Sequence, residues 1–432
     1  MASASFMGGI FPLVAFYPKL DARIQPSRCH SEPPNSELDF LRPPVDTGAM
    51  HVSKVLTDSR RNVSVPEWKF SSEELGGGTG PWSVVKRTLA GGRQSGVEVI
   101  EVDNGVLQFT VVPTRGLNVW TAMAGDELRL GWDSPVQEIV HPQFVNLAER
   151  GGLGWLDGFG EWICRCGLES FGPPCQDGGQ TLTLHGRINY LPASRVEVVF
   201  ESAPVARLVI RGTVDETLMF GPQLRLSAEI GTEIGQPALT LNDTVTNLGD
   251  GPQEMQLLYH LNFGPPLLGA GAEFVAPVKR VAPRDARAAE GMSRWNLYAG
   301  PQPPGYREEV YLAELHADPD GRTEAALKSP DGSKGALVSF NVQELPYMVL
   351  WKNEAPAKSG YVTGLEPATG FPYSRPVERA AGRVSTLAAG QRYHAQVTIT
   401  ALTSREAVRN VVTRIDALRH AEPEISHTPL QS

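Results

Sequence analysis

The hydrophobic residues of this chain fall into short runs, many of them alternating with polar residues, from about residue 82 to residue 402. Alternation with a period of two is typical of β-strands that bury one face. Glycine, proline, asparagine and aspartate separate the runs, as expected of turns. The pattern predicts strands at residues 97–102, 106–112, 196–200, 208–214, 224–230, 239–245, 255–259, 336–340, 348–351 and 393–402.

Such a long series of strands without intervening helical periods favours an all-β fold, an antiparallel sandwich or barrel, over a doubly wound α/β sheet. One short helix is predicted near the C-terminus, where Thr403 and Glu406 can form a capping box. The apolar residues that follow lie on one helical face: Val408, Val411, Val412, Ile415 and Leu418.

The two ends of the chain lack any such period. Residues 1–49 are rich in proline among serine and acidic residues, which predicts a disordered N-terminal extension. Residues 421–432 contain two more prolines and are predicted to form a flexible tail. The segment between them, residues 50–420, is predicted to form a single domain.

Composition limits the partners of this domain. The 432 residues carry a formal net charge of -9 and contain no basic run, which argues against a nucleic-acid partner. No stretch approaches the roughly 18 to 20 apolar residues needed to span a bilayer, so no membrane partner is expected. The apolar run at residues 6–16 is short, contains two glycines and a proline, and is a poor secretion signal. We therefore expect a cytoplasmic protein.

The four cysteines are too few for a disulfide framework in a chain of this length. Cys164, Cys166 and Cys175, followed by His185, have a conceivable metal-ligand order, but they lack the tighter pairing that brings two thiolates to one zinc ion. We expect reduced, metal-free thiols around a loop.

Three polar sites stand out against the strand pattern. They are His185 in TLHGRINYLPA (183–193), His260 in LLYHLNFGPPLL (257–268) and Glu366 in TGLEPATGFPYSR (363–375). Each lies close to the end of a predicted strand or just beyond it, so the three can meet in one cleft. Two imidazoles and a carboxylate are the minimum for moving one proton off a substrate oxygen while placing another on it.

These three segments resemble the aldose 1-epimerase (galactose mutarotase-like) superfamily, and within it a poorly characterised branch that includes deoxyribose mutarotase-like proteins. Two further segments are similar to that branch: VVPTRGLNVW (111–120) and GLGWLDGFGEWICRCGLESFGPP (152–174). The resemblance covers roughly residues 80 to 405. It implies a β-supersandwich, in which large antiparallel sheets pack face to face and one concave surface binds the sugar.

The resemblance also implies residue roles. His260 matches the general acid, Glu366 the general base and His185 a second histidine that hydrogen-bonds to the substrate. The implied reaction interconverts the α and β anomers of a free aldose and requires no cofactor or metal. Acid–base exchange of this kind suits an imidazole near neutral pH and a carboxylate whose pKa its pocket sets.

The remaining substrate-binding candidates rest on weaker patterns. The strand period puts Asn262 on the same face as His260, and Asp157 lies in a Gly- and Trp-rich loop that can contact sugar hydroxyls. Known mutarotases use a sugar-binding arginine, and Arg115, Arg165 and Arg187 are the alternatives for it. Arg115 ends a predicted strand, and Arg187 stands where better-known members have glycine.

Two other functions fit the same residues. A non-catalytic sugar-binding protein on this fold would keep the aromatic loop without needing both His260 and Glu366. A lyase or glycosidase is the other alternative, but a glycosidase normally needs two suitably placed carboxylates, and only Glu366 has a strong motif context.

Overall fold

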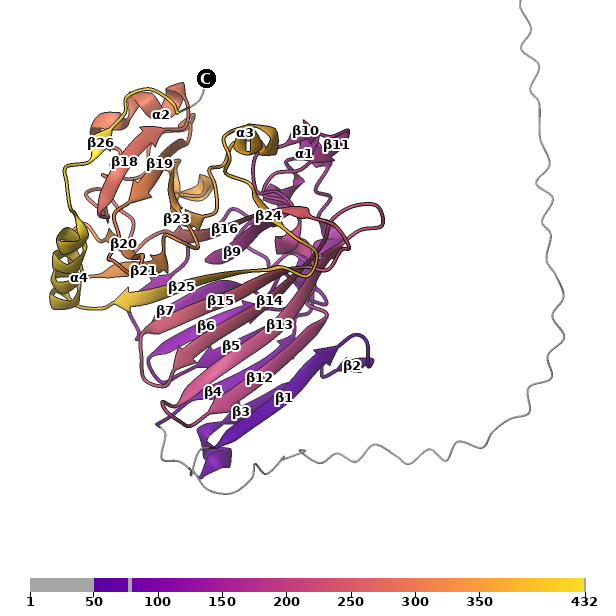
Figure 1. The fold of residues 1–432 in the computed structure, drawn as a ribbon. Helices are drawn as coiled ribbons and strands as arrows, with labels where there is room; N and C mark the ends of the chain where they lie inside the picture. Colours follow the sequence, from indigo (N-terminus) through magenta and orange to yellow (C-terminus); the bar gives the residue numbers. More distant parts are fainter. Residues whose placement is uncertain (1–49, 77–79, 431–432) are drawn as a thin grey trace, which may run out of the picture. The chain divides into compact units, whose positions relative to one another are not determined.

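The computed structural model describes residues 50–76 and 80–430 of the chain. The predicted disordered extension at residues 1–49 lies outside the described residues. The strands of the described residues form two large, mainly antiparallel sheets and one small hairpin, and Figure 1 shows strands of one large sheet lying over those of the other. The all-β sandwich predicted from the alternating pattern is confirmed.

Within the described residues, the first sheet has ten strands, and neighbouring strands pair antiparallel. From one edge to the other their order is β17 (Glu273–Val275), β20 (Arg322–Lys328), β21 (Gly335–Asn341), β25 (Arg392–Leu402), β15 (Ala238–Asn247), β14 (Gln223–Glu233), β13 (Arg207–Thr217), β12 (Arg195–Glu201), β1 (His51–Asp58) and β2 (Val63–Ser64).

The second sheet has fourteen strands in the same described part of the chain. Its main path is β26 (Glu424–Ile425), β18 (Val278–Pro283), β19 (Glu309–Leu315), β22 (Tyr347–Asn353), β23 (Val362–Ala368), β16 (Gln253–Phe263), β9 (Ile163–Leu168), β7 (Asn118–Ala124), β6 (Leu107–Val112), β5 (Glu98–Asp103), β4 (Ser83–Thr88) and β3 (Trp68–Ser71). Two short strands lie off this path, β24 (Ser385–Leu387) beside β16 and β8 (Leu128–Leu130) beside β7. A separate hairpin joins β10 (Cys175–Asp177) to β11 (Gln180–Leu182).

The main core fills the space between the two sheets. Strand β15 shows how the sequence builds it, because its residues alternate between buried and half-buried along its whole length. Leu239, Leu241 and Val245 point into the core, while Thr240 and Asn242 point outward. Every second residue of a strand faces the same side, so the alternation in the sequence becomes a sheet with one apolar and one polar face.

The helices are short, with one exception. They are α1 (Glu149–Gly152), α2 (Ala286–Glu290), α3 (Arg375–Ala380) and α4 (Arg405–Leu418). Helix α4 is the predicted C-terminal helix and buries Val408, Val411 and Ile415 against the first sheet. None of the helices in the described part of the chain has the length and apolar character to cross a membrane.

Two details at the C-terminal end differ from the prediction. The N-cap of α4 is Ser404, whose hydroxyl accepts a hydrogen bond from Ala407 N (3.1 Å), and not Thr403. Both residues suit this position, and the apolar stripe alone leaves the first turn uncertain by one residue. Glu424–Ile425, within the predicted tail, form the short strand β26 beside β18.

Candidate active site

His260 lies on β16, which runs between β9 and β23 in the second sheet (Figure 1). The side chain of Tyr259 points into the core between the sheets, where its hydroxyl donates to Asp243 Oδ2 (2.8 Å). His260 points to the opposite face and is 4 % exposed. The strand extends beyond the predicted residue 259 to Phe263, so His260 lies within it and not at its end.

Glu366 lies on the neighbouring strand β23, which the sequence pattern did not predict. In the pairing of β16 with β23, Leu261 stands opposite Leu365 and Asn262 opposite Gly364. This register brings His260 alongside Glu366. A Cβ added at Gly364 would overlap Glu366 Oε1 and lie 3.2 Å from His260 Cε1. Gly364 therefore leaves the space into which the carboxyl turns.

The two side chains form a close, buried pair. His260 Nε2 and Glu366 Oε1 are 3.2 Å apart, and both side chains are at most 5 % exposed. Burial, assisted by negative charge nearby, raises the pKa of Glu366 well above its usual value. Burial, together with the neighbouring His185, lowers the pKa of His260 well below its usual value. The pair therefore favours a protonated carboxyl beside a neutral imidazole.

Several buried polar atoms around this pair have no hydrogen-bond partner among the described residues. Although His260 and Glu366 are close, their atoms are not aligned for a hydrogen bond. The unpaired atoms at the site are His260 Nδ1, Glu366 Oε1, Asn262 Oδ1 and Trp155 Nε1. Buried polar groups are normally paired in folded proteins, so a cluster of unpaired ones indicates a place where a polar ligand completes the hydrogen bonds.

Aromatic side chains enclose the pair. The ring of His260 lies 5.2 Å from that of Trp351, 5.3 Å from that of Phe159 and 6.3 Å from that of Trp155. Phe159 and Trp155 also contact each other, with ring centroids 4.6 Å apart. This wall keeps water from the pair, which is the physical cause of both pKa shifts.

His185 reaches the same place from the loop that follows β11. Its backbone has a left-handed conformation (φ 56°), and its N–H donates to Gly172 O (3.1 Å). Its ring Nδ1 lies 3.0 Å from Phe171 O, which can only accept, so Nδ1 carries a proton. The ring is 5.5 Å from that of His260 and 4.7 Å from that of Trp155.

Cys166 influences the charge of His185. Burial alone would raise the pKa of this thiol, but Cys164 and His185 outweigh burial and lower the pKa to about 6. Burial would lower the pKa of His185, but Cys166 outweighs it and raises that pKa. The two groups favour a thiolate beside an imidazolium, in which His185 Nε2 is also a donor.

The position of these cysteines corrects the prediction of a loop. Cys164 and Cys166 lie on β9, fully buried in the apolar cluster that includes Trp155 and Phe159. The Gly-rich flanks of this short strand hide it in the sequence. Cys164, Cys166 and Cys175 carry free thiols. Among the residues that the structure describes, no group of histidine, cysteine, aspartate or glutamate is arranged to hold a metal ion.

Arg115 does not occupy the substrate-binding position predicted for it. Its guanidinium is fully buried, and it donates from Nε to Glu161 Oε1 (2.8 Å), from Nη1 to Val140 O (2.7 Å) and from Nη2 to Gly158 O (3.0 Å). These contacts lie beneath the aromatic loop and leave no exposed donor for a sugar. The sequence placed Arg115 at the end of a strand but contained no sign of its burial.

Arg165, the second of the three arginines, is also enclosed. It is fully buried, and its Nη2 donates to Asp243 Oδ1 (2.9 Å) while its Nη1 donates to Leu117 O (2.9 Å). Asp243 also accepts from Tyr259 on the core side of β16. Arg165 therefore stabilises the strand that carries His260 from behind.

The other predicted substrate-binding residues lie around the site in different ways. Asn262 is buried and donates from Nδ2 to Glu161 O (3.0 Å), while its Oδ1 is one of the unpaired atoms. Asp157 is partly exposed and pairs with Arg150 (2.7 Å). Arg187 lines a neighbouring pocket behind the His185 loop.

The rim contains residues that the sequence did not identify. Trp351 Nε1 donates to Glu308 Oε2 (2.7 Å), and Glu308 Oε1 lies 3.1 Å from Arg284 Nη2. The side chains of Arg284 and Glu308 are 26 % and 45 % exposed, so both remain accessible. Trp351 is half-buried beside His260. Trp351 lies on β22, whereas Arg284 and Glu308 lie at the two ends of the connection between β18 and β19, and no local spacing connects them to His260.

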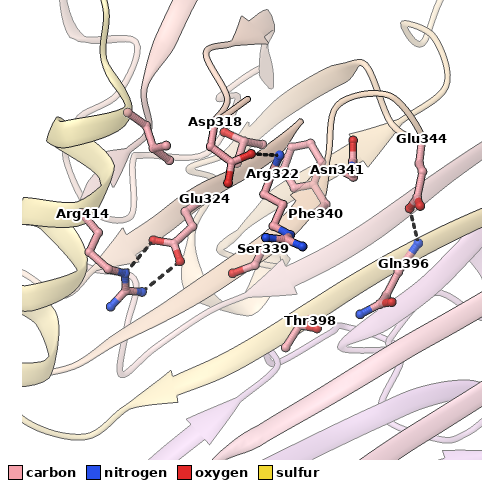
Figure 2. A pocket seen from close by; sticks show the side chains of 12 residues that line it. Asp318, Arg322, Glu324, Ser339, Phe340, Asn341, Glu344, Gln396, Thr398 and Arg414 are labelled. Atoms are coloured by element: carbon pink, nitrogen blue, oxygen red, sulfur yellow. Dashed lines mark hydrogen bonds and ion pairs between the residues drawn. The ribbon is translucent and has the colours of Figure 1, made fainter. Parts of the chain in front are cut away.

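Another pocket, of about 510 Å³, lies between α4 and the polar outer face of β20, β21 and β25 (Figure 2). Its charged groups satisfy one another. Figure 2 shows Arg414 pairing with Glu324 (3.0 Å), and Glu344 accepting from Gln396 N (2.9 Å). Unlike the cluster at His260, this pocket is a solvated sheet face with paired polar side chains.

Known proteins share the sequence pattern and the fold of this chain. Residues 94–401 match the model of a family described as a "Domain of unknown function (DUF4432)". The chain is similar to a "putative aldose 1-epimerase" of known structure from Klebsiella pneumoniae, with 35 % identity and a TM-score of 0.86 over 89 % of this chain and 100 % of that one. It shares its fold with a galactose mutarotase-like protein from Clostridium acetobutylicum (13 % identity, TM-score 0.52, 78 % and 98 % covered). A search of curated proteins found no match.

Proposed function

This chain belongs to the DUF4432 branch of the aldose 1-epimerase (galactose mutarotase-like) superfamily, and we propose that it interconverts the α and β anomers of a free aldose. The observation that carries the proposal is the buried pair of His260 and Glu366, 3.2 Å apart and surrounded by unpaired polar atoms. A sugar-binding surface alone would not require two titratable groups with pKa values shifted in opposite directions.

The spacing of the pair suits the reaction. In a cyclic aldose, the hydroxyl oxygen O1 and the ring oxygen O5 are both bonded to C1, so the groups that serve them must lie side by side. One group removes the proton from O1–H while the other protonates O5. The C1–O5 bond then breaks to give the open-chain aldehyde, rotation about C1–C2 follows, and reclosure gives the other anomer.

The pKa directions add a detail to the roles that the sequence resemblance implies. Those roles place the proton on His260 as acid and leave Glu366 as base. With the proton on Glu366, as the pKa shifts favour, the roles are exchanged: Glu366 protonates O5, and neutral His260 Nε2 accepts the O1 proton. In both descriptions the pair of His260 and Glu366 holds one proton, so the two arrangements belong to the same macroscopic protonation state.

The surrounding residues support a polyhydroxylated substrate. Trp351 offers an apolar ring face beside His260, and Glu308 and Arg284 offer charged hydrogen-bonding groups at the rim. We propose that His185 donates from Nε2 to a sugar hydroxyl, with Cys166 favouring its charged form. Which aldose is accepted depends on this rim.

The test is the equilibration of freshly dissolved single anomers across a panel of free aldoses, followed by polarimetry or NMR. Glu366→Gln and His260→Ala should each slow the exchange by at least about 10²-fold, as is typical for loss of a general acid or base. His185→Ala should mainly raise KM, because an orienting hydrogen bond contributes on the order of 1 to 3 kcal/mol. Wild-type protein that binds a sugar without accelerating its mutarotation would overturn the proposal in favour of a sugar-binding protein.

A further inference from the structure

A second polar pocket of about 380 Å³ lies behind the loop that carries His185. It is formed by the segment after β9, the segment from β11 to Arg187, the loop before α1 and the end of β13. The backbone of the two loops separates the pocket from the His185 ring, because Gly186 N–H and its neighbours pack tightly on Gly167 and Ser170. A Cβ at Gly186 would overlap the carbonyl oxygens of both residues.

Two polar side chains of this pocket, Ser170 and Arg187, have hydrogen-bonding groups that no described residue engages. The hydroxyl of Ser170 is buried (the residue is 2 % exposed) and has no hydrogen-bond partner among the described residues. The guanidinium of Arg187 has no ion pair with any carboxylate of the described chain. The third polar group, Glu216, is 1 % exposed and accepts from Leu168 N (2.9 Å) and Glu169 N (3.1 Å), one bond on each carboxyl oxygen. In the pocket of Figure 2, by contrast, the charged groups pair with one another.

The charges of the pocket are nearly balanced, which argues against an ionic ligand. Arg187 contributes a positive charge that interacts with the buried carboxyl of Glu216, whose pKa is raised by burial. Glu169, the other carboxylate, lies 3.4 Å from Arg375 and is neutralised by it. An anionic ligand would lie beside the carboxyl groups of Glu169 and Glu216, and a cationic ligand would lie beside the guanidinium of Arg187, so neither charge suits the pocket.

What remains is a mixture of donors and acceptors beside apolar surface. Leu147 and Leu182 line the same pocket as Ser170, Arg187 and Glu216. Hydroxyl groups donate and accept at once, and the C–H faces of a sugar ring pack on apolar side chains, so a neutral polyhydroxylated ring matches all these groups. The volume is within the range of small-molecule sites. We infer that this pocket is a second binding site for a neutral sugar ring, separate from the site at His260.

The inference does not rest on the proposed activity, because it concerns binding alone. The probes are methyl β-D-galactopyranoside and methyl β-D-glucopyranoside, whose O1 is blocked so that they cannot open. We would titrate each into the full chain and follow binding by calorimetry and ligand-observed NMR. The wild type should show two classes of site for at least one probe.

Variants assign the two classes. Ser170→Val fills the pocket and removes its free hydroxyl, and Arg187→Met removes the unpaired donor. Each of these two variants should weaken the affinity of the same class of site by at least about tenfold, the loss expected when a buried hydrogen bond is removed. Trp351→Ala should weaken the other class. Ser170→Ala is the milder variant if the valine impairs folding, which thermal melting would reveal.

The outcomes separate this inference from the proposed function. A single class of site for both probes, or two classes unchanged in Ser170→Val and Arg187→Met, would overturn it. Two classes in a protein that does not catalyse mutarotation would support the second site while the activity fails. A protein that catalyses mutarotation but shows only the Trp351-dependent class of binding site would support the proposed function and overturn the second site.

Discussion

Two kinds of buried charge lie around β9, β16 and β23 of the second sheet. Behind β16 and beneath the aromatic loop, Arg165 and Arg115 are fully buried and hydrogen-bonded to carboxylates and carbonyl oxygens. On the other face, His260 and Glu366 are almost as deeply buried, yet both retain atoms without a partner. Depth of burial is therefore similar in the two regions, and completeness of pairing distinguishes them.

The difference teaches how to separate structural from chemical groups in this fold. A buried charge that the protein neutralises completely has no capacity left for a substrate. A buried pair that stays neutral and incompletely bonded can exchange a proton when a hydroxyl arrives. Experiments on the two regions should accordingly affect different quantities: stability in the first and reaction rate in the second.

The largest expected effect is on the stability of the structural region. Glu161→Gln removes the charge that neutralises Arg115 and leaves a buried guanidinium uncompensated. Breaking a buried ion pair in this way costs about 3 to 5 kcal/mol, which urea unfolding would measure. Glu101→Gln is the matched control, because the Glu101–Arg87 pair is largely exposed and should contribute at most about 1 kcal/mol. Equal losses in the two variants would contradict the comparison.

The next effect is a gain in the free energy of unfolding when Glu366 of the proposed catalytic pair is replaced by glutamine. Because the pKa of Glu366 is raised on folding, the native state holds its proton over a pH range in which the unfolded chain has lost it. The contribution of Glu366 to the free energy of unfolding is therefore fully present below the ordinary carboxyl pKa. It is lost as the pH rises, by at most about 1.4 kcal/mol per pH unit. Because glutamine does not ionise, the Glu366→Gln variant should not lose stability with rising pH in this way.

Denaturation at pH 5, 6, 7 and 8 measures the effect. The difference in free energy of unfolding between Glu366→Gln and wild type should move in favour of the variant as pH increases. Glu101→Gln again controls for loss of one carboxyl at an exposed position. A difference that is constant with pH would show that the carboxyl ionises normally in the folded protein.

The smallest effect concerns the geometry of the pair alone. In Gly364→Ala the new methyl group would occupy the space of Glu366 Oε1, so the carboxyl must turn away from His260. Because such displacement costs proton transfer without removing either group, we expect roughly a tenfold loss of mutarotation rate. Gly231→Ala, on β14 where a Cβ meets nothing closer than 3.9 Å, is the matched control. Full activity in Gly364→Ala would show that this glycine does not position the carboxyl.

The sequence predicts the fold well because the alternation of β13 to β15 is a local property of the chain. It also places His260 and Asn262 on one face of a strand. It does not reveal β9 or β23, since the first is flanked by glycines and the second contains Gly364 and Pro367 among its seven residues.

The sequence resemblance identifies the pair but not its surroundings. That Gly364 makes room for Glu366, or that Trp351 and Glu308 lie at the rim, depends on pairing between strands far apart in the chain. Whether an arginine is buried is likewise decided by tertiary packing, which is why the choice among Arg115, Arg165 and Arg187 could not be made from spacing.

The position of the pair within the sheet has a consequence for how such proteins diversify. His260 and Glu366 lie on adjacent interior strands, whereas Arg284 and Glu308 flank the long connection between β18 and β19. Insertions or substitutions in that connection alter recognition while leaving the proton-transfer geometry in place. If the proposed function holds, a protein of this architecture can change the sugar that it accepts through this connection while the reaction stays the same.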